Sequence, residues 1–243
     1  ACFGVSGGYE RPMWFALDGK KPEYEYSYNH QNWYPSAKYE TKNTVSNVGL
    51  FDLTPFSKFE IFSENAYEEL QKICTANIKN EIGKCTYTQM LNSDGGIETD
   101  LTVICLDKDY FRIISSAATR ERDKFHIKKH LHEDIELKDV TDDFCVFGLF
   151  GPKSRDLIQS LSNDNFENDN FKFATAKYII IDGVKIWAQR LSYVGELGYE
   201  LYVEFKDAKK IYDLIIEAGK NFELSNCGMH AMDIMRMESG FLH

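Results

Sequence analysis

Three short segments combine residue types and spacings that suit chemistry on a small polar ligand. The first is Ile97–Leu101, an expected strand. Because side chains alternate along a strand, Glu98 and Asp100 share one face. Two carboxylates beside apolar neighbours suit proton transfer or recognition of an amine. The same pattern is typical of the polar outer face of a half-exposed sheet, and the sequence pattern leaves both interpretations open.

The second segment is Ser192–Glu200, where glycines lie on both sides of Glu196. Gly195 and Gly198 place Glu196 on a sharp turn between two expected strands, where a ligand can approach closely. A carboxylate at such a turn can accept two parallel N–H bonds from a planar, amidine-like ring edge. The alternative is a solvated hairpin tip.

The third segment is Gly228–Glu238, an expected helix. Arg236 lies on its otherwise apolar stripe, so a buried Arg236 needs an anionic partner. That partner is either the carboxylate of a ligand or a structural aspartate, and the pattern does not distinguish the two.

The elements that position these segments follow a repeated order. Hydrophobic periodicity predicts a strand, a helix, three strands and a helix, and then the same order again. The first round covers residues 58–62, 65–74, 86–91, 98–105, 110–115 and 120–130. The second covers 145–150, 152–161, 177–182, 184–190, 199–205 and 207–222, and a last helix begins near 228. We therefore expect an α+β fold of two similar strand-helix-three-strand-helix units packed together, about 56–132 and 144–222.

Composition argues against several classes of function. The chain of 243 residues has 28 Lys and Arg against 38 Asp and Glu, a net charge of −10, and no basic tract to follow a nucleic-acid backbone. Its apolar runs are too short to span a bilayer, so neither a nucleic acid nor a membrane is expected as a partner. The six cysteines include no C-x-x-C pair, which favours reduced thiols in the cytoplasm, or in the mitochondrial matrix of a eukaryote. Because Ala1 stands in place of Met, we also expect a piece of a longer chain.

Two further patterns are weaker. Gly4, Ser6 and Gly8 fit the spacing of a hydrolase nucleophile turn, but too few residues precede them for the strand that this turn needs. The histidines at 126, 130 and 132 resemble a metal cluster, yet lysines surround them and no suitably spaced further ligand is evident. We expect a glycine-rich arm in the first case and a solvated basic helix, with no metal, in the second.

Together these segments resemble the folate-binding aminomethyltransferase family, which includes the T-protein of the glycine cleavage system. The resemblance rests on five motifs in order, namely Val48–Lys58, Gly95–Ile97, Gly151-Pro152, Tyr193–Glu200 and Asp233–Glu238. Residues 48–243 are therefore expected to form the folate-binding domain, after a loop-rich aromatic arm at 1–47. Within the arm, Glu10–Phe15 and Gln31–Trp33 resemble segments that open the folate half of dimethylglycine and sarcosine dehydrogenases.

The resemblance implies a reaction and a set of site residues. A one-carbon unit would pass from a small methylated amine, or its iminium, to tetrahydrofolate, giving 5,10-methylenetetrahydrofolate. A flavin-dependent dehydrogenase domain or subunit is an expected partner, because in these relatives a flavin oxidises the amine. Asp100 resembles the catalytic carboxylate near the folate nitrogens. The implied cofactor-binding residues are Glu196 on the pterin edge, Tyr87 and Tyr193 as ring-packing residues, the helix Arg236, and Ser116, where the family has an Asn near the third strand.

Two other functions stay open at the level of sequence. A folate-dependent demethylase of a sulfonium compound would use an aromatic cage for the cation. Such a cage could come from Tyr24, Tyr26, Tyr28 and Trp33. The other alternative is a binding module on the same fold that performs no chemistry.

Overall fold

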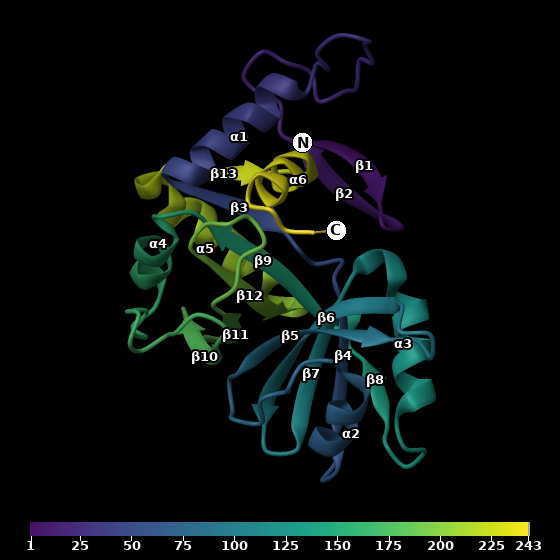
Figure 1. The fold of residues 1–243 in the computed structure, drawn as a ribbon. Coiled ribbons are helices and arrows are strands. Elements are labelled where there is room, and N and C mark those ends of the chain that lie inside the picture. Colours follow the sequence, from purple (N-terminus) through teal and green to yellow (C-terminus); the bar gives the residue numbers. More distant parts are fainter. Residues whose placement is uncertain (243) are drawn as a thin grey trace. The chain divides into compact units, whose positions relative to one another are not determined.

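The computed structural model describes residues 1–242 and shows an α+β protein. His243, the last residue of the expected folate-binding domain, lies outside them. The chain forms two compact units (Figure 1). Unit 1 contains residues 1–54, 145–173 and 178–243, and unit 2 contains 55–144 and 174–177. Unit 2 is thus inserted in the sequence of unit 1.

A six-stranded sheet is the centre of unit 1. Its strand order is β10-β11-β12-β9-β3-β13. The strands are β3 (Val48–Asp52), β9 (Phe144–Phe150), β10 (Ala176–Ile181), β11 (Val184–Gln189), β12 (Gly198–Glu204) and β13 (Leu224–Cys227). β3 pairs antiparallel with β9 and parallel with β13, so the strand after the N-terminal segment lies between strands from later in the chain.

One face of this sheet carries the main core of unit 1. The alternate residues Ile186 and Ala188 of β11, and Leu201 of β12, are buried there without exposure. Two amphipathic helices, α4 (Ser154–Leu161) and α5 (Ala208–Gly219), add apolar residues to the same core. Because strand side chains alternate, the intervening residues of β11 and β12 lie on the opposite face.

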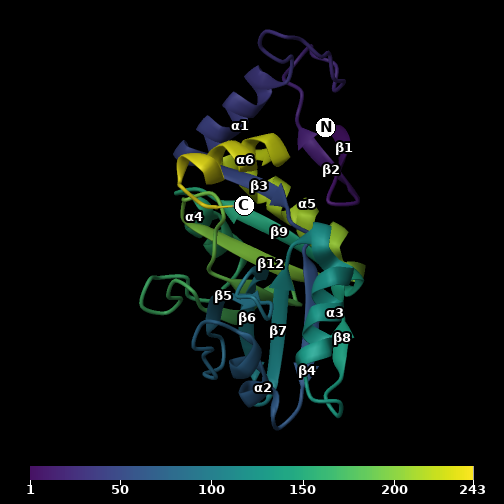
Figure 2. The same ribbon diagram turned by 45° about the vertical axis from the view of Figure 1, so that its right-hand side comes forward.

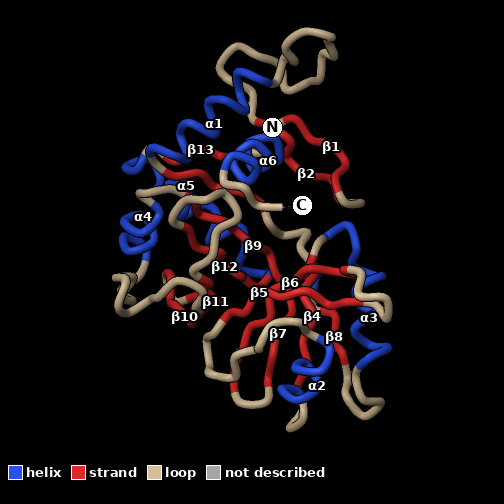
Figure 3. The backbone as a smooth tube through the Cα atoms, viewed as in Figure 1, coloured by secondary structure: helices blue, strands red, loops and turns tan. Residues whose placement is uncertain are grey.

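The ends of unit 1 form a second group of elements. They are the hairpin β1 (Cys2–Ser6) and β2 (Tyr9–Trp14), helix α1 (Tyr34–Ser46) and helix α6 (Met229–Glu238). α1 lies beside α6, as Figure 2 shows. Figure 3 shows the loop that joins β2 to α1. Glu40 of α1 accepts hydrogen bonds from the backbone N–H groups of Phe15 (2.6 Å) and Gly228 (2.8 Å), and so connects three distant segments.

Unit 2 is a five-stranded antiparallel sheet with two helices. Its order is β5-β6-β7-β4-β8. The elements are β4 (Ser57–Phe62), α2 (Ala66–Ile73), β5 (Cys85–Leu91), β6 (Ile97–Asp107), β7 (Tyr110–Ser115), α3 (Arg120–His130) and β8 (Leu137–Asp139). The core side of the sheet includes Leu101 and Val103 of β6, packed with Leu70 of α2 and Ile127 of α3.

The predicted order of elements is confirmed in both units. Unit 2 has β4, α2, β5, β6, β7 and α3 in sequence, and unit 1 has β9, α4, β10, β11, β12 and α5. A tight turn at Asp182-Gly183, with φ of 46° and 78°, joins β10 to β11. That the two rounds are related repeats, with the stated boundaries, stays a prediction.

The expectation of a loop-rich arm at residues 1–47 is wrong in part, because this segment holds β1, β2 and α1. Hydrophobic periodicity does not predict α1, because the buried face of this helix is largely polar. Ser36, Glu40, Asn43 and Thr44 are buried there with Ala37, so no apolar stripe marks the helix. Gly4 and Ser6 lie in β1, which turns back into β2, so this segment is a β-hairpin and not the expected glycine-rich arm. A hydrolase nucleophile turn leads into a helix, and none follows here.

The structure of residues 1–242 also describes the cysteines, the possible metal ligands and the lengths of the helices. The cysteines are all free, and all but the partly exposed Cys145 are buried. In this part of the chain no group of His, Cys, Asp and Glu side chains is arranged to hold a metal. Its helices include none with the length and apolar character that crossing a membrane requires.

Candidate functional site

The predicted catalytic carboxylate lies on the exposed face of the unit 2 sheet. Alternation along β6 buries Thr99 and Leu101 and leaves Asp100 exposed, as the sequence predicts. Tyr87, on the neighbouring strand β5, donates a hydrogen bond from its hydroxyl to Asp100 Oδ2 at 3.0 Å. The structure therefore brings two of the six predicted site residues into direct contact.

Ser116 follows β7 and begins a short 3₁₀ turn. Its hydroxyl accepts a hydrogen bond from the N–H of Ala118 (3.3 Å), and its carbonyl accepts one from the hydroxyl of Ser57 (3.0 Å). The hydroxyl of Ser115 is buried and has no hydrogen-bond partner within residues 1–242. Ser116 therefore has a structural task as the cap of a turn, and Ser115 is the residue of this pair with an unused buried group.

Glu196 lies on the loop between β11 and β12, as predicted. Gly195 takes a left-handed conformation there, with φ of 77°. A Cβ at Gly195 would come within 2.1 Å of Ser239 Oγ, so the loop needs glycine for space as well as for conformation. Glu196 is partly buried, burial raises the pKa of its carboxyl, and it has no hydrogen bond or ion pair within the described residues.

Tyr193 and Arg236 lie against the end of α6 in the same unit. The Tyr193 hydroxyl donates to the carbonyl of Leu242 at 2.8 Å, and its ring stacks on Phe241. Arg236 donates from Nε to Asp233 Oδ1 at 3.0 Å and from Nη1 to the carbonyl of Phe241 at 3.3 Å. Asp233 is therefore the anionic partner that the position of Arg236 requires.

Sequence reasoning missed a polar row on the second face of the unit 1 sheet. Gln189 of β11 and Glu200 of β12 are directly paired on that face. Glu200 Oε2 accepts a hydrogen bond from the buried Tyr202 hydroxyl at 3.1 Å, and desolvation raises the pKa of Glu200 to about 7. The signal was available, because period-2 alternation sets Glu200 apart from Tyr199 and Leu201, which pack into the core.

The four aromatic residues of the possible cation cage do not form a box. The rings of Tyr24 and Tyr26 stack on each other at 5.6 Å, and the ring of Trp33 stacks on His230 at 4.0 Å. Tyr28 is fully exposed. These faces are occupied by neighbouring rings, so the geometry does not favour the sulfonium alternative.

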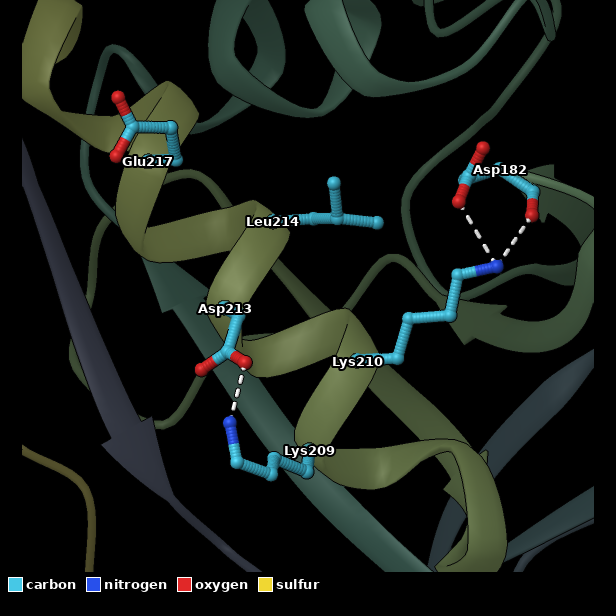
Figure 4. Close-up of a pocket in the computed structure, with 6 residues that line it drawn as sticks. All are labelled: Asp182, Lys209, Lys210, Asp213, Leu214 and Glu217. Atoms are coloured by element: carbon cyan, nitrogen blue, oxygen red, sulfur yellow. Dashed lines mark hydrogen bonds and ion pairs between the residues drawn. The ribbon is translucent and has the colours of Figure 1, made fainter.

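A surface depression of about 620 Å³ lies along α5 and holds none of the predicted residues (Figure 4). Both lysines of its lining are paired with lining carboxylates: Lys209 with Asp213, and Lys210 with Asp182. With its cations already neutralised and with one apolar side chain, Leu214, in its lining, this depression offers little to a ligand.

The predicted residues therefore fall into two groups. Asp100, Tyr87 and Ser116 belong to unit 2, and the other three belong to unit 1, where the Glu196 loop contacts the end of α6.

The chain is similar to known proteins over its whole length. The family model described as the GCVT N-terminal domain matches residues 1–243. Over the whole chain, the sequence is 36% identical to 4-methylaminobutanoate oxidase (formaldehyde-forming) of Paenarthrobacter nicotinovorans, and spans 30% of that protein. It is 32% identical to mitochondrial dimethylglycine dehydrogenase of Rattus norvegicus over 98% of the chain and 28% of that protein.

A solved structure shows the same fold. Glycine cleavage system aminomethyltransferase T from Bartonella henselae superposes with a TM-score of 0.81 at 19% identity, over 99% of this chain and 59% of that one. Since the family model covers every residue, the chain belongs to the GCVT N-terminal domain family.

Proposed function

We propose that this chain is the tetrahydrofolate-binding, one-carbon-transferring part of an enzyme that acts on a small methylated amine. The product would be 5,10-methylenetetrahydrofolate. The observation that carries the proposal is Asp100, exposed on its sheet face and held by Tyr87, within a chain that belongs to this family from end to end. The whole-chain relatives are named for methylated amines, 4-methylaminobutanoate and dimethylglycine.

The residues of unit 1 fit the pterin ring of a folate. That ring presents neighbouring N–H donors, which a carboxylate accepts in parallel. Two carboxyls of unit 1 have this chemistry, Glu196 on the loop and Glu200 on β12, and desolvation raises the pKa of both. We retain Glu196 as the proposed pterin ligand and add Glu200. The pKa of Glu200 is about 7, so N–H donors from a ligand would stabilise its carboxylate form. Tyr193 supplies a ring for packing, and Arg236 braces the end of α6.

Tetrahydrofolate supplies the nucleophilic nitrogens that accept the one-carbon unit. In unit 2, the Asp100 carboxylate would orient the cofactor and stabilise a cationic iminium by its charge. The Tyr87 hydroxyl fixes the rotamer of Asp100 through the 3.0 Å hydrogen bond. Ser116 stays a proposed cofactor contact, in the position of the family's Asn.

A flavin-dependent domain or subunit is the proposed partner. Oxidation of a methylated amine to an iminium removes two electrons, and a carboxylate and a tyrosine cannot accept them. The relatives named as an oxidase and a dehydrogenase are more than three times as long as the part that this chain matches.

Titration calorimetry with 5-formyltetrahydrofolate, a stable reduced folate, tests the proposal. The unchanged chain should bind it, and Glu196→Gln and Glu200→Gln should be measured in parallel. Loss of one charge-assisted pair weakens binding by roughly 1–3 kcal/mol. If only one variant weakens binding, that carboxyl is the pterin ligand. Binding equal in all three proteins would contradict both assignments.

A binding module without chemistry is the remaining alternative. It predicts folate binding but no transfer when an amine and a flavin-dependent dehydrogenase are supplied. Formation of methylenetetrahydrofolate in that mixture, absent without this chain, would exclude it.

A further inference from the structure

The side-chain amide of Gln189 is a buried polar group of unit 1. Gln189 has 0% exposure, and within residues 1–242 neither its Oε1 nor its Nε2 has a hydrogen-bond partner. Two residues earlier on the same face of β11, the indole N–H of the buried Trp187 is also unpaired in the described chain. Buried amides in native proteins nearly always have partners, since an unpaired one is costly to bury.

Gln189 does not stand alone on this face. Its partner in the strand register is Glu200, while the adjacent pair Ala188 and Leu201 points into the core on the other side. Tyr202 binds Glu200 through Oε2, and Oε1 of the same carboxyl has no partner among residues 1–242. At the paired positions 189 and 200, three polar atoms are therefore without a partner among residues 1–242. They are the donor Nε2 and the acceptor Oε1 of Gln189, and Oε1 of Glu200.

The chemistry of the two side chains is complementary. A carboxylate only accepts hydrogen bonds, whereas an amide both donates and accepts. A ring with neighbouring N–H donors and a carbonyl beside them would satisfy both side chains at once. The lactam ring of a pterin has this pattern, and a hydrocarbon or a simple amine does not.

We infer that Gln189 is a specificity-determining residue that reads the lactam carbonyl of a reduced pterin beside the edge taken by Glu200. The inference rests on the folate-binding function proposed above and names the part of the cofactor that this face recognises. The Nε2–H of Gln189 donates to the carbonyl, and Oε1 accepts a neighbouring N–H. A pterin held in this way would give the Gln189 amide the partners that it lacks among residues 1–242.

The substitution Gln189→Met tests the inference, because Met keeps the unbranched shape and removes both polar atoms. Removing an unpaired buried amide should raise the unfolding temperature of the ligand-free chain. The same change should raise the Kd for 5-formyltetrahydrofolate by about tenfold or more. Gain of stability together with loss of affinity is the expected signature of a binding group.

Gln159→Met is the matched control. The Gln159 amide donates to the carbonyls of Ser162 and Asp164 and accepts from the N–H of Phe166. The identical substitution should therefore lower the unfolding temperature and leave the Kd unchanged. Should Gln189→Met fail to fold, Gln189→Leu also removes both polar atoms without adding a charge beside Glu200, and it is expected to weaken binding as well.

Four results would contradict the inference on Gln189 or the proposed function. An unchanged Kd in Gln189→Met, beside normal binding by the unchanged chain, overturns the inference and leaves the proposed function intact. A lower unfolding temperature in Gln189→Met shows a structural amide and also overturns it. p-Aminobenzoylglutamate, which lacks the pterin, should bind both proteins equally, and a loss with this fragment contradicts a pterin contact. No binding by the unchanged chain overturns the proposed function, and with it the ligand named here.

Discussion

Gln189 and Glu200 occupy directly paired positions on β11 and β12, on the sheet face opposite the core of unit 1. An amide without a protein partner thus lies next to a carboxyl whose pKa is raised to about 7 by desolvation. Such a carboxyl changes charge near neutral pH. Binding of a ligand to it can therefore be detected as uptake or release of protons.

Folate binding should release protons if Glu200 receives the N–H donors. Hydrogen bonds to the carboxylate lower its pKa, so the fraction protonated in the free chain must ionise on binding. At pH 7 about half a proton should be released. Calorimetry in buffers of different ionisation enthalpy measures this number, and Glu200→Gln should abolish it. Release that persists in Glu200→Gln would assign the protons to another group.

Asp100→Asn should affect transfer more than binding. The amide keeps the size of the side chain and loses the charge that would stabilise a cationic iminium, a loss on the scale of 10²–10³ in rate. The measurement is the single-turnover rate of folate methylenation beside the Kd for 5-formyltetrahydrofolate. Tyr87→Phe keeps the charge of Asp100 and removes the hydroxyl that donates to it at 3.0 Å, so it should give a smaller loss. Equal loss of rate and affinity in Asp100→Asn would indicate a purely binding role.

Glu40 should make the chain less stable as the pH rises. Burial raises the pKa of this carboxyl to about 7, although hydrogen bonds from Gly228 and Phe15 oppose the shift. A folded-state pKa above the unfolded value gives stability that is full below about pH 4.5 and is lost as the pH rises through 7. For this shift the loss is up to about 3 kcal/mol. His230, whose pKa is lowered by burial, acts in the opposite sense.

The Glu40 contribution can be isolated by difference. Glu40→Gln removes the titration and one N–H acceptor, so its unfolding temperature should be lower at pH 5 and approach that of the unchanged chain by pH 8. Thermal unfolding followed by circular dichroism between pH 5 and 8 provides the comparison. Parallel curves for the two proteins would refute the assignment.

Gly195→Ala should disrupt the Glu196 loop. The left-handed φ of 77° disfavours alanine by about 1–2 kcal/mol, and the new Cβ would lie 2.1 Å from Ser239 Oγ. Gly183→Ala is the control, since Gly183 has a φ of 78° and no atom within 4 Å of an added Cβ. Gly195→Ala should lower the unfolding temperature more than Gly183→Ala and also weaken folate binding. A similar effect of both would mean that the contact with Ser239 is unimportant.

Much of the fold follows from periodicity. The predicted bounds of α3, 120–130, are the observed ones, and the helix has acidic residues in its first turn and basic residues in its last. β3 and β13 were missed, since each is short and is defined by a partner far away in sequence. α1 was missed because tertiary contacts, such as Asn43 with the carbonyl of Glu223, replace an apolar face.

The residues of the candidate site that belong to sequence motifs could be predicted, and the others could not. The contact between Asp100 and Tyr87 follows from strand pairing, although sequence pattern alone did not foresee the hydrogen bond. The positions of Glu196 and Arg236 followed from glycine spacing and helix pattern. Gln189 could not be found, because a glutamine in a strand gives no sign in the sequence that its amide lacks a partner.

The parallel pairing of β3 with β13 has a consequence for synthesis on the ribosome. β13 is made more than 170 residues after β3, so the six-stranded sheet stays incomplete until β13 emerges. The inserted unit 2 has all its strands once residue 139 is made, and its last residues are 174–177. During translation the edge of β3 that later pairs with β13 is therefore unpaired. An unpaired strand edge can pair with a wrong strand, so the nascent chain needs protection during this time.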